Sequence, residues 1–98
     1  MSDSEIRQET ARWLANRLGE LSTLKKSGRL ARGVAAEQAV QAVAEARKRL
    51  RGQQRLKHCY ATALDRLERV CRNGWVAEAS EYVGHPDFFG SLLRGERY

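Results

Sequence analysis

Hydrophobic residues recur at spacings of three and four along most of this 98-residue chain, which is the pattern of helices that bury one face. The first such helix is expected over about residues 4–26. Its apolar face consists of Ala11, Leu14, Leu18 and Leu21. β-branched residues are few and never alternate with a period of two, so the sequence predicts no strands. The single proline, Pro86, leaves residues 1–85 without a helix breaker. We therefore expect an all-α fold.

Two more long helices are expected over residues 34–51 and 53–72, on either side of Gly52. The apolar face of the first is mostly alanine, which lets a neighbouring helix approach closely. It consists of Ala36, Ala39, Val43, Ala46 and Leu50. The apolar face of the second helix is displaced by one residue from the repeat of apolar positions in the first. It consists of Leu56, Tyr60, Ala63, Leu67 and Val70. At Gly52 the chain either breaks or continues as one long helix with a stutter, and we favour the break.

The C-terminal quarter is expected to form two short helices. Asn73-Gly74 is a typical helix stop, and the next helix is expected over about residues 75–83. A last helix is expected from Pro86, because proline suits the first helical position. The prediction is one domain over residues 1–98. It is a small bundle of three longer helices, or a hairpin plus a bent long helix, closed by two short C-terminal helices.

Basic residues are concentrated in the middle of the chain. The formal net charge is +6, from 18 basic and 12 acidic residues, but residues 24–57 hold ten basic and two acidic groups, a net of +8. If the first two helices form an antiparallel hairpin, this charge divides into two poles roughly 25 Å apart. Such density favours contact with phosphates. The predicted polyanion-binding residues are Lys25, Lys26, Arg29, Arg32, Arg47, Lys48, Arg51, Arg55 and Lys57.

Three of these arginines recur at every fourth position. On a continuous helix Arg47, Arg51 and Arg55 would form a ridge with about 6 Å between neighbours, suited to a phosphate backbone. Arginine also favours bidentate contacts with carboxylates, so an acidic protein surface is an alternative partner. A third interpretation is a solvated face that keeps the protein soluble.

Five of the seven aromatic residues lie in the last 24 positions. One interpretation is that they cover the open end of the helical hairpin. The other is that they anchor a partner, since tryptophan, tyrosine and arginine are typical anchors of interfaces. The predicted partner-binding residues are Trp75, Tyr82, Phe88 and Phe89.

The same segment resembles a repressor-type helix-turn-helix, with residues 79–84 as helix and glycine turn and residues 89–97 as recognition helix. The resemblance covers about 20 residues and implies recognition of DNA. The second helix is one residue short of that pattern, and Gly90 falls where an apolar residue is usual. The last predicted helix, from Pro86 to Gly95, holds Asp87, two phenylalanines and one arginine, which is poor chemistry for reading base edges, so we do not assign the family.

Candidate chemistry beyond binding is sparse. The candidate metal ligands are His58, Cys59, Cys71 and His85, which include no Cys-x-x-Cys pair, so we expect no metal or cofactor. The two cysteines lie about 18 Å apart along the predicted helix, too far for a disulfide. Reduced thiols, no apolar run of about 20 residues and an acidic start without a signal peptide predict a cytoplasmic protein without membrane contact.

We therefore expect a small non-enzymatic protein that works by binding. The first hypothesis is that a basic helical face, residues 24–57, contacts nucleic acid or another polyanion. The alternative is a protein-interaction regulator, of the kind of a small phage-type inhibitor or adaptor. It would occupy a partner's surface through the aromatic C-terminal segment and the basic face. A third hypothesis is a homodimer that pairs through the alanine-rich second helix.

Overall fold

The computed structural model describes residues 3–50 and 57–84, with side chains over residues 5–50 and 64–83. The regular structure in these residues is helical throughout, which confirms the all-α class. Its helices are α1 (Asp3–Lys26), α2 (Arg32–Arg49), α3 (Lys57–Arg72) and α4 (Val76–Gly84). None of them is both long and apolar enough to cross a membrane, as far as the described residues show.

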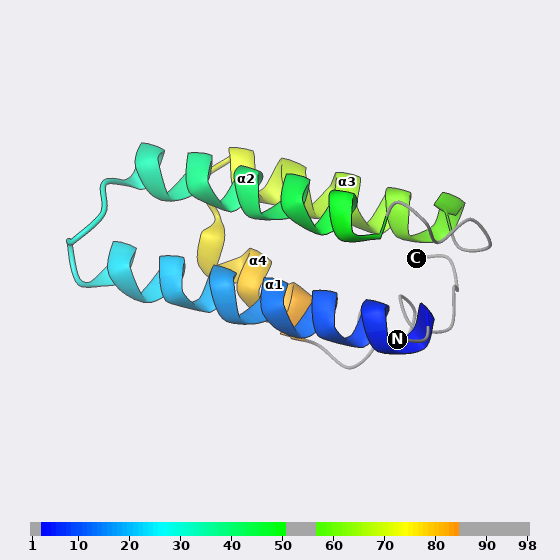
Figure 1. Cartoon of the computed structure of the whole chain (residues 1–98). Coiled ribbons are helices and arrows are strands. Elements are labelled where there is room, and N and C mark those ends of the chain that lie inside the picture. Colours follow the sequence, from blue (N-terminus) through cyan, green and yellow to red (C-terminus); the bar gives the residue numbers. More distant parts are fainter. Residues whose placement is uncertain (1–2, 51–56, 85–98) are drawn as a thin grey trace.

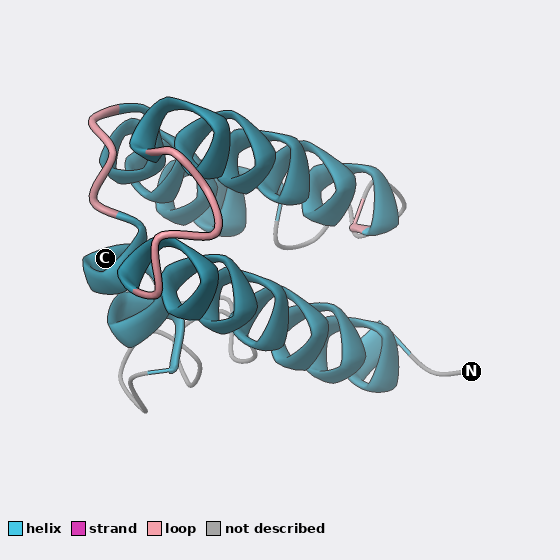
Figure 2. Ribbon diagram, turned by 90° about the vertical axis from the view of Figure 1, so that its left-hand side faces the viewer, coloured by secondary structure: helices cyan, strands magenta, loops and turns pink. Residues whose placement is uncertain are grey.

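Successive helices run in opposite directions, and α2 and α3 lie on one side of the bundle with α1 and α4 on the other (Figure 1). α1 lies beside α2 and α4, and α3 lies beside α2 and α4, so α1 and α3 are diagonal to each other. Figure 2, seen along the helices, shows the connection between α1 and α2 and the turn between α3 and α4 at the same end. Residues far apart in the sequence therefore share this end of the molecule.

The core forms where leucines of α1 face small residues of α2. Leu14, Leu18 and Leu21 are buried, as their spacing predicts. The buried face of α2 consists of Ala35, Ala39, Ala42, Val43, Ala46 and Leu50. Ala36, which we predicted on this face, is only partly buried, because α2 packs against α1 and α3 at once and the face toward both begins at Ala35.

α3 differs from the prediction in the face that it buries. Leu64, Leu67 and Cys71 are buried, whereas Val70, which we predicted in the stripe, lies at the edge of the core. The reason is that α3 packs against both α2 and α4, so its buried face is the one directed between them. The core is completed by Val76, Ala79 and Val83 of α4.

The structure also separates the second and third helices. α2 ends at Arg49, where the Leu50 N–H donates to the Ala46 carbonyl over 3.1 Å, and α3 runs back beside it. They are two packed helices and not one continuous helix, as the out-of-step stripes favoured. Gly52 itself, and the last short helix predicted from Pro86, lie outside the described residues.

Candidate functional site

The antiparallel packing of α1 and α2 separates the predicted polyanion-binding residues into two groups. One lies at residues 25–32, where α1 passes into α2, and the other includes Arg47 and Lys48 at the far end of α2. Arg32 and Arg47 are about 22 Å apart along the helix axis, at 1.5 Å per residue. The remaining predicted residues lie outside the described side chains, namely Arg51, Arg55 and Lys57.

Arg47 is used inside the protein. Its Nη2 donates to Asp65 Oδ1 over 2.6 Å and its Nη1 to Glu68 Oε1 over 2.7 Å, so the guanidinium joins α2 to α3. The hydrogen bond from Arg47 lowers the pKa of the Glu68 carboxyl. Arg72 approaches the same carboxyl, with its Nε 3.4 Å from Glu68 Oε2. We call Arg47, Asp65 and Glu68 the Arg47 cluster.

The predicted ridge of three arginines depends on one continuous helix through Gly52. α2 ends at Arg49, so no continuous helix carries the four-residue spacing past that point. The one described member, Arg47, already has two carboxylate partners. The two carboxylates already balance the charge of Arg47 and would repel a phosphate, so the other group of cations is the better candidate for binding one.

Two cations of that other group hold the turn between α3 and α4. Lys25 Nζ donates to the Gly74 carbonyl over 2.8 Å, and Arg32 Nη2 donates to the Asn73 carbonyl over 3.1 Å. These carbonyls follow the C-terminus of α3, where the helix dipole favours positive charge. A Cβ placed on Gly74 would lie 2.5 Å from Arg32 Nε, so the close approach of Arg32 depends on the glycine.

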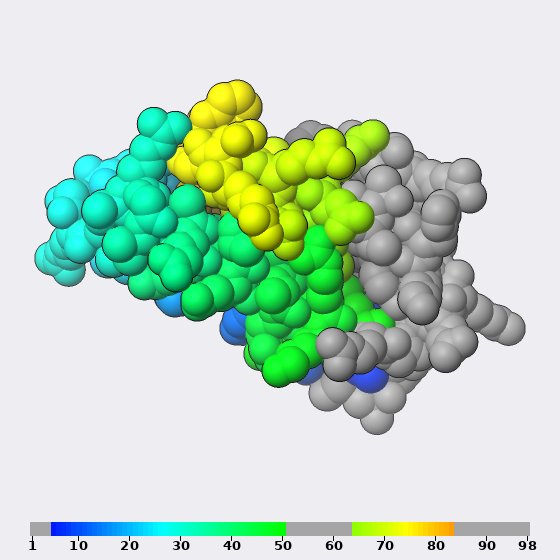
Figure 3. All heavy atoms as spheres, turned by 90° about the horizontal axis from the view of Figure 1, so that it is seen from above, coloured from blue at the N-terminus to red at the C-terminus, as the bar shows by residue number. Residues whose placement is uncertain are grey.

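These contacts join two connections into one surface, which we call the loop-end surface. It consists of Lys26, Arg29, Arg32, Arg72 and Trp75. All five side chains are exposed. Figure 3 shows the end of α3 beside the first turns of α2, which follow the connection between α1 and α2. The acidic residues on the nearest helical turns are Glu37 on α2, Glu68 on α3, which pairs with Arg72, and Glu78 on α4, so the four cations of the surface exceed its three acidic neighbours by one.

Arg72 is a member that the sequence prediction missed. It lines a shallow hollow of about 350 Å³ with Gly33 and Glu37, which places it next to the first turns of α2. The prediction passed over it because residues 58–98 contain more acidic than basic groups. The signal that could have found it is local, since Arg72 directly precedes the Asn73-Gly74 stop.

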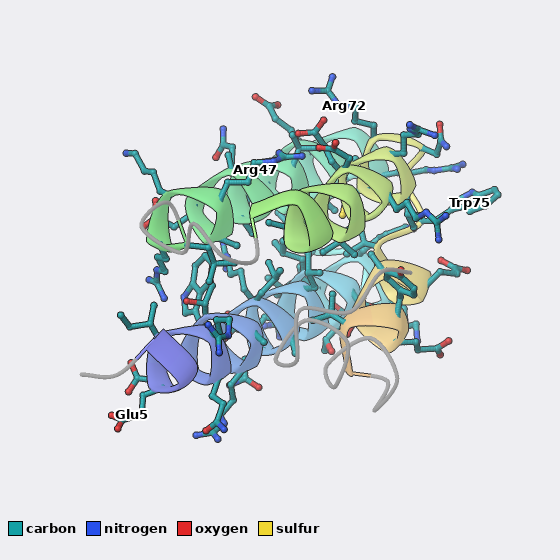
Figure 4. The ribbon with its side chains drawn as sticks, turned by 90° about the vertical axis from the view of Figure 1, so that its right-hand side faces the viewer. Glu5, Arg47, Arg72 and Trp75 are labelled. Carbon is teal, nitrogen blue, oxygen red and sulfur yellow. The ribbon has the colours of Figure 1, made fainter. Side chains whose placement is uncertain are left out.

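The predicted aromatic residues do not form one site. Trp75 is 54% exposed, and Figure 4 shows it pointing away from the helices. Tyr82 is partly buried against the core, and burial raises the pKa of its hydroxyl. It lines a separate hollow of about 320 Å³ on α3 and α4, together with Arg66 and Arg69. The other two predicted aromatics, Phe88 and Phe89, lie outside the described residues.

The described side chains offer little for bond-making chemistry. Burial raises the pKa of the Cys71 thiol to about 11, so it stays protonated at neutral pH and is a poor nucleophile. Among the described residues no group of three or more His, Cys, Asp or Glu side chains could hold a metal ion. The other candidate ligands, His58, Cys59 and His85, lie outside the described side chains.

The loop-end surface combines exposed cations with one exposed aromatic ring. Lysine and arginine are hydrogen-bond donors to phosphate, and an indole face can stack on another aromatic ring. The arrangement is therefore suited to a ligand that carries both negative charge and planar rings. Comparisons of the chain with protein-family models, curated proteins and solved structures find no significant match.

Proposed function

We propose that this protein is a small non-enzymatic nucleic-acid-binding protein that contacts phosphates with its loop-end surface. One observation carries the proposal. The bond from Arg32 to the Asn73 carbonyl brings the cations of the α1–α2 connection beside Arg72 and Trp75. A guanidinium has five N–H donors, so the bond to Asn73 leaves donors of Arg32 for a phosphate.

The expected strength of binding follows from the number of cations. Lys26, Arg29 and Arg32 could neutralise about three phosphates and release their counterions, whereas Arg72 shares its charge with Glu68. For three contacts the affinity would fall roughly 20- to 40-fold between 50 and 200 mM salt. Such steep dependence on salt is the signature of a polyanion ligand.

An acidic protein surface is the second candidate, and the exposure of Trp75 is the observation that favours it. A tryptophan that is 54% exposed resembles the anchors of protein interfaces. A regulator or inhibitor of this type would occupy its partner with Trp75 at the centre and the cations around it. Its affinity would depend on salt far less steeply than that of a polyanion contact.

The test is fluorescence anisotropy with labelled single- and double-stranded DNA at 50 and 200 mM salt. Lys26→Gln/Arg29→Gln removes two exposed cations of the loop-end surface. The matched control, Arg12→Gln/Lys48→Gln, removes two exposed cations elsewhere. We expect the first variant to bind at least about tenfold more weakly at 50 mM salt and to have a shallower salt slope, by about 0.7–0.9 for each lost contact.

The control variant should bind within twofold of the unmodified protein. Equal weakening of both variants would mean that net charge attracts the DNA and that the loop-end surface is not a site. The absence of binding at 50 mM salt would exclude the nucleic-acid function. In that case a protein partner becomes the remaining interpretation of the surface.

A further inference from the structure

The two tryptophans of this protein have opposite surroundings. Trp13 packs against the core, and the Arg49 guanidinium lies 4.1 Å from the centroid of its ring. Trp75 is 54% exposed, and no cation–π contact involves it within the described residues. Trp13 therefore has a structural role, whereas burial does not explain a tryptophan at position 75.

The backbone that carries Trp75 is firmly held. The Trp75 N–H donates to the Val70 carbonyl over 3.1 Å, and its own carbonyl accepts from the Ala79 N–H over 3.0 Å. The carbonyls just before it accept from Lys25 and Arg32. All four helices thus contribute to fixing the turn. A ring on such a turn can bind with little loss of conformational entropy in the backbone.

The surroundings of Trp75 are those of a nucleic-acid stacking site. Arg32 bonds to the turn two residues before the ring, and Arg72 precedes it by three residues. Proteins that bind single strands combine such cations, which follow the phosphates, with aromatic side chains on which bases stack. Inside a duplex the base faces are covered by their neighbours, so an indole on an outward turn reaches them only at the cost of unstacking base pairs.

We infer that Trp75 stacks on an unpaired base, so that the loop-end surface takes single-stranded nucleic acid in preference to duplex. This inference rests on the proposed function, because the cations of the same surface supply the phosphate contacts. A second observation agrees with a binding surface here. The two exposed large hydrophobic side chains in the described part of the chain, Val34 and Trp75, both lie at the loop end of the bundle.

The experiment compares three labelled probes of equal length at 50 mM salt. They are a 20-nucleotide oligothymidine, a 20-unit abasic strand with the same phosphates and no bases, and a 20-base-pair duplex. We expect the protein to bind oligothymidine about tenfold more tightly than the abasic strand, the effect of one stacked base. Trp75→Ala should remove this preference and leave binding to the abasic strand unchanged. Trp75→Phe should keep most of it.

Tryptophan fluorescence provides an independent readout. Oligothymidine should quench part of the emission of the unmodified protein and none of that of Trp75→Ala, in which Trp13 alone emits. Because Trp75 is largely exposed, the alanine variant should unfold in urea at nearly the same midpoint, which excludes a folding defect as the cause.

The outcomes separate the inference from the proposed function. Equal, salt-dependent binding of oligothymidine and the abasic strand, with no effect of Trp75→Ala, would overturn the stacking inference and leave the polyanion function in place. Tighter binding of the duplex would also overturn it. The absence of binding to all three probes would overturn both, and a protein partner anchored by Trp75 would then be tested.

Discussion

Two cations that lie in one basic segment of the sequence have different surroundings in the fold. Lys26 is exposed and forms no ion pair with any described residue, whereas the Arg47 side chain is 32% exposed and lies between two carboxylates. A cation that lies between two carboxylates gains less from a phosphate, because its charge is already balanced and the carboxylates repel the phosphate. The role of each cation thus depends on its neighbours in space.

The Arg47 cluster predicts a loss of stability without a loss of binding. Arg47→Gln should lower the free energy of unfolding by about 1 kcal/mol at pH 7, as expected for partly exposed ion pairs. The cluster should also respond to acid. The pKa of Glu68 is lowered in the folded protein, so its stabilising contribution is complete above the ordinary value of 4.5 and is lost as the pH falls through the lowered pKa.

Urea unfolding of the unmodified protein and of Arg47→Gln from pH 7 down to pH 3 would check both statements. The difference in stability between the two proteins should shrink at the acidic end. Arg12→Gln, an exposed arginine on α1 with the same change of charge, should differ little from the unmodified protein at any pH. A loss of DNA binding in a folded Arg47→Gln would contradict the placement of the site at the loop end.

At the scale of elements, two glycines shape the connections that meet at the loop end. Gly28 lies in the α1–α2 connection with φ +77°, and Gly74 in the α3–α4 turn with φ +84°. Both have the left-handed conformation that side chains disfavour. They differ in their surroundings, since an added Cβ meets nothing within 4 Å at Gly28 but meets the Arg32 side chain at Gly74.

This difference predicts different effects of the same substitution. Gly28→Ala and Gly74→Ala should each lower the free energy of unfolding by about 1–2 kcal/mol through backbone strain. Only Gly74→Ala should also weaken DNA binding, because it displaces Arg32 from the turn. Thermal unfolding and anisotropy on the same two variants would measure both effects. Equal losses of binding in both would show that Arg32 does not depend on Gly74.

At the scale of the whole molecule, the alanine-rich face of α2 is part of the core of the single chain. Ala35, Ala39 and Ala46 are fully buried between α1 and α3, where their small size lets the helices approach. This face is therefore not an exposed surface for a second copy. A homodimer through it would require the bundle to open.

A pair of leucine substitutions tests this placement. Ala39→Leu should lower the free energy of unfolding by about 1–3 kcal/mol through overpacking. Ala44→Leu, on the exposed side of the same helix, should change it by less than about 0.5 kcal/mol. Urea unfolding measures both, and sedimentation shows whether either variant changes the mass. A dimer that Ala39→Leu dissociates without unfolding the chain would contradict the internal position of this face.

Sequence reasoning predicted the helices but missed part of the buried face of α2 and α3. The single buried stripe of α1 was predicted correctly because its leucines repeat along one face. On α2 the buried face includes Ala35 in place of Ala36, and on α3 it includes Cys71 in place of Val70. Alanines lie on several sides of α2, and Val70 and Cys71 are adjacent on α3, so periodicity alone does not specify which of these side chains face the neighbouring helices.

At the candidate site, the difference between what the sequence predicts and what packing decides is clearer. A count of charges along the chain identifies the cations near Lys26, but it also includes Arg47 and omits Arg72. The sequence by itself determined that the chain is helical, where its first helices begin and end, and that its middle is basic, because these properties depend on neighbours along the chain. The tertiary structure alone decided that Arg47 pairs with carboxylates of α3 and that Arg32 meets the turn before Trp75, because only packing brings residues of separate helices together.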